Sequence, residues 1–343
     1  MKPFKLTAVG RERWDRFKAN KRGFASLWIF VGVFLLTLFS ELIANDRPLL
    51  IIYGGKPYFP QMARYTEKEF GGEFDMEADY RDPYVAGLIN EKGFIVHPLI
   101  RFSYSSINYD LPSPAPSPPT KDNWLGTDDR GRDVLARLLY GFRISVLFGL
   151  TLTFFSSIIG IAVGAAQGYY GGRVDLIGQR VMEVWSGMPT LFLLIILASV
   201  VQPDFWWLLG ITLLFGWMGL TGVVRAEFLR ARNFEYVQAA KALGMSDARV
   251  MFVHILPNAM TASLTFLPFI LGGSITTLTS LDFLGYGLPV GSPSLGELLA
   301  QGKANLHAPW LGISAFVVLG ASLSLLVFIG EAVRDAFDPR RSR

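Results

Sequence analysis

Long apolar runs alternate with polar segments along this chain. Six of these runs are long enough to be membrane helices, because about 20 apolar residues cross the hydrocarbon core of a bilayer. The predicted spans cover residues 24–44, 144–169, 181–201, 205–224, 259–281 and 311–330. The pattern predicts an all-α polytopic membrane protein with six transmembrane helices, five of them in a core at 144–330.

The composition supports this fold class. The chain is 51% hydrophobic and 17% charged, whereas soluble domains carry about 25% charged residues. It has no cysteine, which excludes disulfides, thiolate zinc sites and cysteine catalysis. The net charge of +4 comes from basic residues beside the predicted spans. We therefore expect a lipid bilayer and no nucleic acid as a partner.

Basic residues also predict the orientation, because cytoplasmic loops carry an excess of Lys and Arg. Residues 1–23 hold eight basic side chains against two acidic ones, and the tail 331–343 holds four arginines. Arg225, Arg230 and Arg232 open the segment 225–258. Both termini and this segment are therefore expected on the cytoplasmic side of the membrane. The first apolar run is too long for a typical signal peptide, which favours an uncleaved anchor.

A hydrophilic insertion, residues 45–143, follows the first predicted span. By alternation it lies outside the cytoplasm, in the periplasm. It mixes acids with enough aromatic residues to pack a small domain, marginally for its size. Residues 111–119, LPSPAPSPP, exclude a helix or a central strand and predict an extended polyproline II linker. A peptide ligand for aromatic grooves is the alternative reading of this run.

The segment 233–258 predicts a helix, a glycine turn and a second helix that leads back into the membrane. Asn233 is the expected N-cap and Glu235 favours the first helical turn. Gly244 is expected to end the first helix as a left-handed cap. Ser246 and Asp247 then begin the second helix. One face of the first helix is predicted from residue spacing to hold Tyr236, Ala239, Ala240 and Leu243. An amphipathic helix lying on the headgroups is the alternative.

Three glycines in the second span recur at four-residue intervals. Gly160, Gly164 and Gly168 predict close approach of another helix backbone, either from this chain or from a partner chain.

Several kinds of chemistry are missing from the sequence. The two Gly-Lys pairs, at Gly55 and Gly302, are not followed by Ser or Thr, so the chain is not expected to bind or hydrolyse ATP. His97, His254 and His307 lie in separate regions and show no metal-ligand spacing. We predict no catalytic, cofactor or metal site, and hence no enzyme. No Asp, Glu, Lys, Arg or His occurs in residues 24–40, 144–170, 184–202, 205–224, 259–281 and 311–330. A proton-driven carrier usually needs ionisable groups buried in the membrane, so the energy should come from a partner.

At the 233–258 segment the chain resembles a known family. Gln238-Ala239-Ala240, Gly244 and His254-Ile255-Leu256-Pro257 resemble the EAA loop of permease subunits in ABC importers. Gln238 stands where that motif has Glu, and His254 stands where it has Ile. Further segments resemble the peptide-importer permeases of the Opp/Dpp type, and the long insertion resembles their Yej-type branch. These segments are Trp124–Asp133, Phe283–Gly285, Pro293–Gly296 and Arg334–Arg340. For Trp124–Asp133, a charged surface helix that satisfies its own charges is the alternative.

The resemblance implies the function and the partners. The chain would be a permease subunit of a peptide importer, in a heterodimer with a second homologous permease. Two ATP-binding cassette ATPases and a periplasmic solute-binding protein would complete the transporter. Coupling to the ATPases would involve the following residues: Glu235, Gln238, Ala239, Ala240, Gly244, Leu256 and Pro257.

Other readings remain open at this point. Nickel or an oligosaccharide could replace peptides as the substrate within this family. A secondary carrier predicts charged or broken helices in paired halves. A non-transport scaffold or receptor leaves the Ala-Ala-x-x-x-Gly loop unexplained. The insertion could cover a gate, dock the solute-binding protein or act as a scaffold.

Overall fold

The computed structural model describes residues 8–201 and 203–338. Its residues fall into two compact units. Unit 1 holds the described residues up to Gly32, Ser145–Pro289 and those from Leu319 onward, and unit 2 holds Val33–Ile144 and Val290–Val318. The expected N-terminal residues 1–7 and the last five residues of the tail lie outside the described residues.

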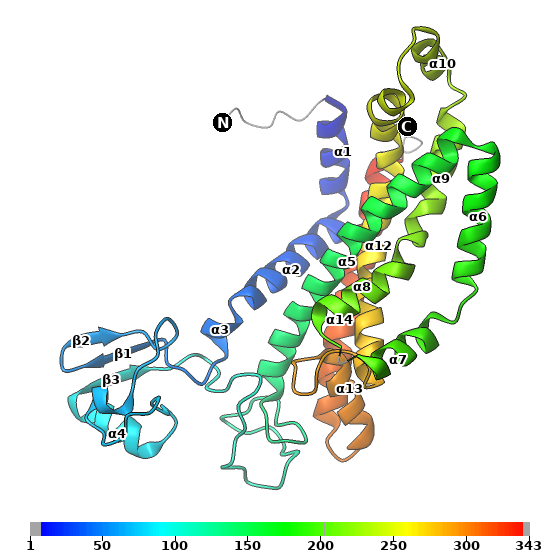
Figure 1. The fold of residues 1–343 in the computed structure, drawn as a ribbon. Helices are drawn as coiled ribbons and strands as arrows, with labels where there is room; N and C mark the ends of the chain where they lie inside the picture. The colour runs from blue at the N-terminus through cyan, green and yellow to red at the C-terminus, as the bar shows by residue number, and fades with distance from the viewer. Residues whose placement is uncertain (1–7, 202, 339–343) are drawn as a thin grey trace. The chain divides into compact units, whose positions relative to one another are not determined.

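Helices make up most of the structure (Figure 1). In the part that the structure describes, five helices are long and apolar enough to cross a membrane: Lys21–Leu38 (α2), Val134–Tyr170 (α5), Phe205–Ala231 (α8 and α9), Asp247–Phe283 (α11 to α12) and Pro309–Phe337 (α14). A sixth span results if α6 and α7 are counted together. The predicted helical membrane fold is confirmed.

The third predicted span differs from the expectation. Instead of one helix over 181–201 preceded by a loop, the structure has α6, Gly172–Ser186, and α7, Thr190–Val200, bent by 66° at the break between them. Pro189 directly precedes α7. Proline has no N–H for the helix ladder and disfavours helical geometry in the residue before it, so the helix breaks here instead of kinking.

The other helical segments of unit 1 include the individual parts of these composite spans and two short helices, α1 (Ala8–Ala19) and α10 (Glu235–Ala242). The parts of the spans are α8 (Phe205–Gly216), α9 (Met218–Ala231), α11 (Asp247–Arg249), the π-helical stretch η2 (Val250–Ile255) and α12 (Leu256–Phe283). Phe17 of α1 packs on Ala332 and Ala336 of α14. The guanidinium of Arg13 lies 4.6 Å from the ring centroid of Phe337. The N-terminal helix is therefore attached to the end of the last helix.

Small residues bring α5 and α9 together in unit 1. A Cβ atom on Gly160, Gly164 or Gly168 would lie 2.6 Å from the carbonyl oxygen of Trp217, Thr221 or Arg225, respectively. The two helices thus meet at four-residue intervals on both sides, and no side chain fits between the backbones. This close approach is made within the chain.

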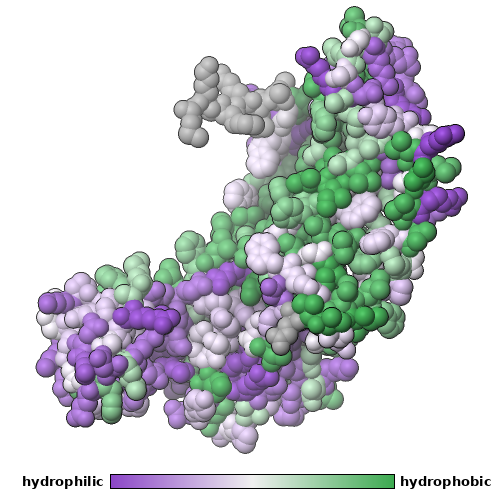
Figure 2. Space-filling model, in the orientation of Figure 1, coloured by the Kyte–Doolittle hydropathy of each residue, from purple (hydrophilic) through white to green (hydrophobic). Residues whose placement is uncertain are grey.

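Unit 2 contains a small domain built on a sheet. Its elements are α3 (Ser40–Ile43), β1 (Leu50–Tyr53), β2 (Lys56–Tyr58), the 3₁₀ turn η1 (Glu67–Phe70), α4 (Pro83–Lys92) and β3 (Gly93–Val96). The strands are antiparallel in the order β2-β1-β3. Ile51, Phe70 and Ile89 are fully buried in its core. The aromatic residues of the insertion therefore pack a domain, which Figure 2 shows covered largely by hydrophilic residues.

Several predicted boundaries need correction. The helix that contains the second predicted span begins at Val134, ten residues before the predicted bound at 144. The last helix continues to Phe337, into the predicted tail. The loop after the fifth span contains a helix, α13 (Leu295–Ala304). Ser294 caps α13 through hydrogen bonds from the N–H groups of Gly296 and Glu297. Residues 111–119 form no helix or strand.

Candidate functional site

The 233–258 segment connects α9 to α12 through α10, a turn and α11. The residue before α10 is Phe234, in an extended conformation with φ −74° and ψ 145°. The predicted N-cap, Asn233, does not cap this helix; its side-chain amide lies 3.5 Å from the carbonyl oxygen of Leu229. Asn233 is one residue too early, because a cap must directly precede the first helical residue.

Gly244 ends α10 in the left-handed conformation that the sequence predicts, with φ +77°. Its N–H donates to Lys241 O at 2.9 Å, and Met245 N–H donates to Ala240 O at 3.2 Å. This pair of bonds is a Schellman motif, which satisfies carbonyls at a helix end. No atom lies within 4 Å of the position that a Cβ would take. The turn therefore requires glycine for its backbone conformation and not for space.

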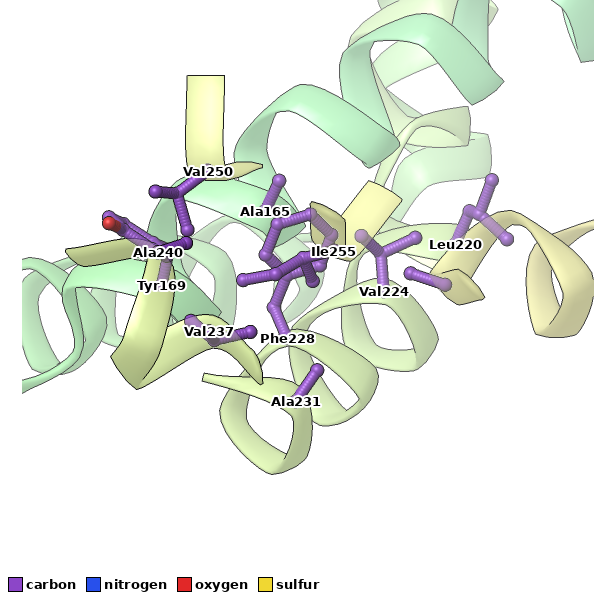
Figure 3. Packing of buried hydrophobic residues seen from close by; sticks show 11 residues of the cluster. Ala165, Tyr169, Leu220, Val224, Phe228, Ala231, Val237, Ala240, Val250 and Ile255 are labelled. Carbon is purple, nitrogen blue, oxygen red and sulfur yellow. The ribbon is translucent and has the colours of Figure 1, made fainter. Parts of the chain in front are cut away.

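One face of α10 is anchored in the protein. Val237 is fully buried and Ala240 is 5% exposed, and both join a core cluster with Phe228 of α9 and Tyr169 of α5 (Figure 3). The prediction that Ala240 shares an outward face with Ala239 is therefore wrong. Val237 and Ala240 are three residues apart, and this spacing defines the inward face; the sequence offered a competing apolar set at 236, 239 and 243.

The opposite face of α10 is open. Its outward side chains are those of Glu235, Gln238, Ala239 and Ala242. Tyr236 and Leu243 flank this row and are 41% and 79% exposed. Small and polar side chains thus form a shallow surface with an apolar edge. We call this set of six residues the α10 surface.

The path from α10 to the membrane helix contains a widened turn. Ser246 directly precedes α11, as predicted, and η2 then continues without interruption into α12. Pro257 lies in the first turn of α12, and it cannot donate to the carbonyl of Val253, four residues earlier. A π-helical stretch relieves this conflict. Leu256 packs against the core cluster, whereas Pro257 is exposed.

Polar contacts attach the segment to α5. Tyr169 Oη donates a hydrogen bond to Asp247 Oδ1. Lys241 Nζ lies 4.4 Å from the centroid of the same tyrosine ring. Sequence reasoning missed Tyr169, Lys241 and Val237, because their roles depend on contacts between positions up to 78 residues apart.

A second polar contact connects α9 to α6. Arg225 donates to both carboxylate oxygens of Asp175, with 2.7 Å between Nη2 and Oδ2. Bidentate arginine–carboxylate pairs are among the stronger polar contacts in proteins. The side chains are 29% and 17% exposed. The contact fixes the start of α6 against the middle of α9.

The charged motif before α5 lies in unit 2. Asp128, Arg132, Arg137 and Glu297 form what we call the charge cluster. Arg137 is fully buried and pairs with Glu297 at 2.6 Å and Asp128 at 3.4 Å; Arg132 pairs with Asp128 at 2.6 Å and Glu297 at 3.2 Å. The alternative of a charged surface helix is therefore wrong, because these charges are buried against α13 and not solvated.

Asp133 sits between this motif and α5. Its Oδ1 accepts from Ala136 N–H at 2.7 Å and its Oδ2 accepts from Asn123 Nδ2 at 2.8 Å. Burial raises the pKa of the Asp133 carboxyl above its ordinary value, although both hydrogen bonds stabilise the ionised form. Burial likewise raises the pKa of Asp129, and the Asp128 charge adds to the effect. Asp133 therefore caps the start of α5, and burial makes its ionised form unfavourable.

Within residues 8–201 and 203–338, no three His, Asp or Glu side chains lie close enough together to hold a metal ion. The candidate functional site therefore consists of the α10 surface and the contacts that fix α10 in place.

The comparisons with known proteins define the class. Residues 156–343, more than half of the chain, match the family described as the binding-protein-dependent transport system inner membrane component. Residues 9–66 match the N-terminal transmembrane domain of oligopeptide transport permease C. The chain belongs to this family of inner membrane permeases of ABC transporters.

Within this family the chain is similar to YejE proteins. It is 64% identical over 338 residues to the inner membrane ABC transporter permease protein YejE of Escherichia coli K12, covering 98% of this chain and 99% of that protein. The peptidoglycan transport system permease protein YejE of Agrobacterium fabrum is 54% identical over 356 residues, with 97% and 93% covered. The oligopeptide permease OppC of Lactococcus lactis subsp. cremoris is 35% identical over 231 residues, with 66% and 78% covered. The predicted resemblance to Opp/Dpp permeases and to their Yej-type branch is confirmed.

Proposed function

We propose that this permease carries short peptides or peptide-like compounds across the bacterial inner membrane, with ATP hydrolysed by partner subunits that dock on the α10 surface. The observation that carries the proposal is the two-sided character of α10. Its inward residues, Val237 and Ala240, are buried in the core, whereas the opposite face is open. A helix held firmly on one side and exposed on the other is suited to transmit a push.

Each predicted coupling residue has a distinct part in this proposal. Ala239 keeps the α10 surface shallow, so that a partner groove can approach the backbone closely. Glu235 and Gln238 offer polar contacts on the same face. Ala240 fixes the helix to the core, and Gly244 sets the direction of the turn. Leu256 and Pro257 connect the segment to α12.

The positive-inside pattern supports the proposed topology. Both termini and the 233–258 segment would lie in the cytoplasm, and the domain of unit 2 would lie in the periplasm. We propose a heterodimer with a second homologous permease, one ATPase docked on each permease and a periplasmic solute-binding protein. An open apolar face on α6, which includes Leu176, Ile177 and Val184, would contact lipid or the second permease.

The proposed mechanism is alternating access. Closure of the two ATPases on ATP would push both docking segments together. Because α11, η2 and α12 form one continuous helix of 37 residues, displacement that passes from α10 through the Gly244 turn to Asp247 would reach the membrane along an unbroken helix. The permease itself would make and break no bond.

Docking can be tested with one substitution and a matched control. Ala239→Arg places a long charged side chain on the α10 surface and should abolish copurification of the ATPase subunits from membranes. Ala63→Arg makes the same change at an exposed alanine in the domain of unit 2 and should leave copurification intact. If ATPases copurify equally with both variants, the α10 surface is not the docking site.

The substrate class is supported by the names of the relatives. Those relatives are named for oligopeptide, dipeptide and peptidoglycan transport, and peptide bonds are common to all three. A strain that lacks this permease should no longer take up short peptides, including peptide fragments of the cell wall. Expression of the permease should restore this uptake. Loss of nickel or oligosaccharide uptake instead would contradict the peptide assignment.

A further inference from the structure

Tyr169 occupies the junction between the 233–258 segment and α5. It lies one residue from the end of α5, 4% exposed, within the core cluster that also contains Val237 and Ala240. The ring fills this cluster as any large apolar side chain would. Its hydroxyl is different, because burying a polar group is costly unless it is hydrogen-bonded. A phenylalanine would fill the same space without that requirement.

The hydroxyl reaches across the turn of the 233–258 segment. Tyr169 Oη donates to Asp247 Oδ1, and Asp247 is the first residue of the helix that becomes α12. From the other side of the turn, Lys241 Nζ of α10 lies over the tyrosine ring at 4.4 Å. One side chain of α5 therefore contacts the residues on both sides of Gly244.

The rest of α5 packs closely against two other helices of unit 1. Immediately before Tyr169, the Gly160–Gly168 stripe packs directly against the backbone of α9. Further along the same helix, a Cβ on Gly149 would lie 2.8 Å from the Leu271 side chain of α12. A displacement delivered to the cytoplasmic end of α5 is thus passed to closely packed neighbours, because packed helices move as rigid bodies.

We infer that Tyr169 is a positioning residue that makes α5 follow the docking segment, as a second path of transmission beside the continuous helix into α12. This inference rests on the proposed docking of the α10 surface. The hydrogen bond to Asp247 joins the two paths, so that α5 and α12 move together. Without it, α12 still follows the segment, and α5 is coupled to it only through helix packing.

Tyr169→Phe removes only the hydroxyl. Since a hydrogen bond to a charged acceptor is worth about a tenfold change in an equilibrium, the population with α5 detached should rise about tenfold. Tyr170→Phe is the matched control, because this neighbouring side chain is 54% exposed. Asp247→Ala should reproduce Tyr169→Phe, and the double variant should be no more severe than either single change.

The measurement uses the assembled transporter in membranes. The sequence has no cysteine, so cysteines placed at Phe154 on α5 and Phe266 on α12, which are 61% and 43% exposed, can carry spin labels. In the parent protein, trapping with ATP and vanadate should leave the distance distribution between the labels unchanged. In Tyr169→Phe it should broaden or shift, while ATPase subunits still copurify.

Two results would overturn the inference. An unchanged distance distribution in Tyr169→Phe would show that the hydroxyl does not hold the two helices together. Loss of ATPase copurification in this variant would show that the hydroxyl serves docking or folding and not transmission. Failure of the docking proposal is seen separately, as Ala239→Arg without effect on copurification.

Discussion

Arg137 and Glu297 meet across 160 residues of sequence, with Nη2 donating to Oε2 at 2.6 Å. The arginine belongs to the first turns of α5 and the glutamate to the first turn of α13. Arg137 also donates to the carbonyl oxygens of Ser292 and Tyr104. This one fully buried side chain therefore holds together three segments of unit 2.

Glu297→Ala should destabilise unit 2 strongly. Without Glu297, the two arginines of the charge cluster share the single carboxylate of Asp128, so one buried positive charge loses its compensation, at a cost of up to about 3–5 kcal/mol. The thermal unfolding midpoint in detergent should fall by several degrees. Glu91→Ala, at an exposed position of α4, is the control and should unfold at the parent temperature. A midpoint for Glu297→Ala equal to that of the control would contradict the stabilising role of the charge cluster.

For Asp133 we expect the opposite effect on stability, because removing its charge should not destabilise the protein at neutral pH. The folded pKa of Asp133 is raised, so the folded state favours the protonated carboxyl. The resulting stabilisation is fully present below the unfolded value of about 3.9 and is lost as the pH rises through the folded pKa. At neutral pH the ionised group is therefore unfavourable. Asp133→Asn keeps an N-cap and should unfold at the same or a higher temperature at pH 7, with a weaker dependence on pH.

The comparison for Asp133 is with alanine. Asp133→Ala removes the acceptor for Ala136 N–H and should cost about 1 kcal/mol at every pH. If Asn and Ala lower the unfolding temperature equally at pH 7, the charge itself is favourable there, against the direction of the pKa shift.

Gly164→Ala tests the packing of α5 on α9. The added Cβ would lie 2.6 Å from Thr221 O and 2.9 Å from Val224 Cβ. Because backbone must shift to accept it, we expect a loss of about 1–3 kcal/mol, measured as a lower unfolding temperature. Gly222→Ala on α9 has open space around its Cβ and should cause no loss. Equal effects at the two positions would point to helix propensity instead of packing.

Gly244 can separate backbone conformation from bulk. With φ at +77° and open space for a Cβ, alanine should be strained by about 1–2 kcal/mol, whereas asparagine tolerates the left-handed region better. ATPase copurification should therefore be weaker with Gly244→Ala than with Gly244→Asn. The reverse order would mean that side-chain size at the docking surface matters more than the turn.

Much of the fold could be predicted from the sequence, because apolar length and charge position are local properties. The apolar runs, the two helices of the 233–258 segment and the left-handed glycine at 244 all follow from neighbouring residues. The helix α13 carried a local signal too, since Ser294 precedes Glu297 by three residues in the pattern of a capping box. It was missed because glycine and proline dominate the surrounding segment.

The contacts of the site could not be predicted in the same way. Whether Val237 or Tyr236 faces inward depends on how α10 docks against α5 and α9, and a helix of eight residues offers two apolar stripes of similar quality. The partners of Tyr169 and Arg137 are distant in sequence. A single sequence shows that such charged or aromatic residues exist, but not which of them meet.

The continuous helix from Asp247 to Phe283 has a mechanical consequence. Its 37 residues correspond to about 55 Å at 1.5 Å per residue, whereas the hydrocarbon core is about 30 Å thick. Its first turns therefore lie outside the hydrocarbon core, in water. A tilt of about 5° would move one end by about 5 Å relative to the other. A small rotation of this helix about the point where it enters the bilayer would therefore move its two ends in opposite directions.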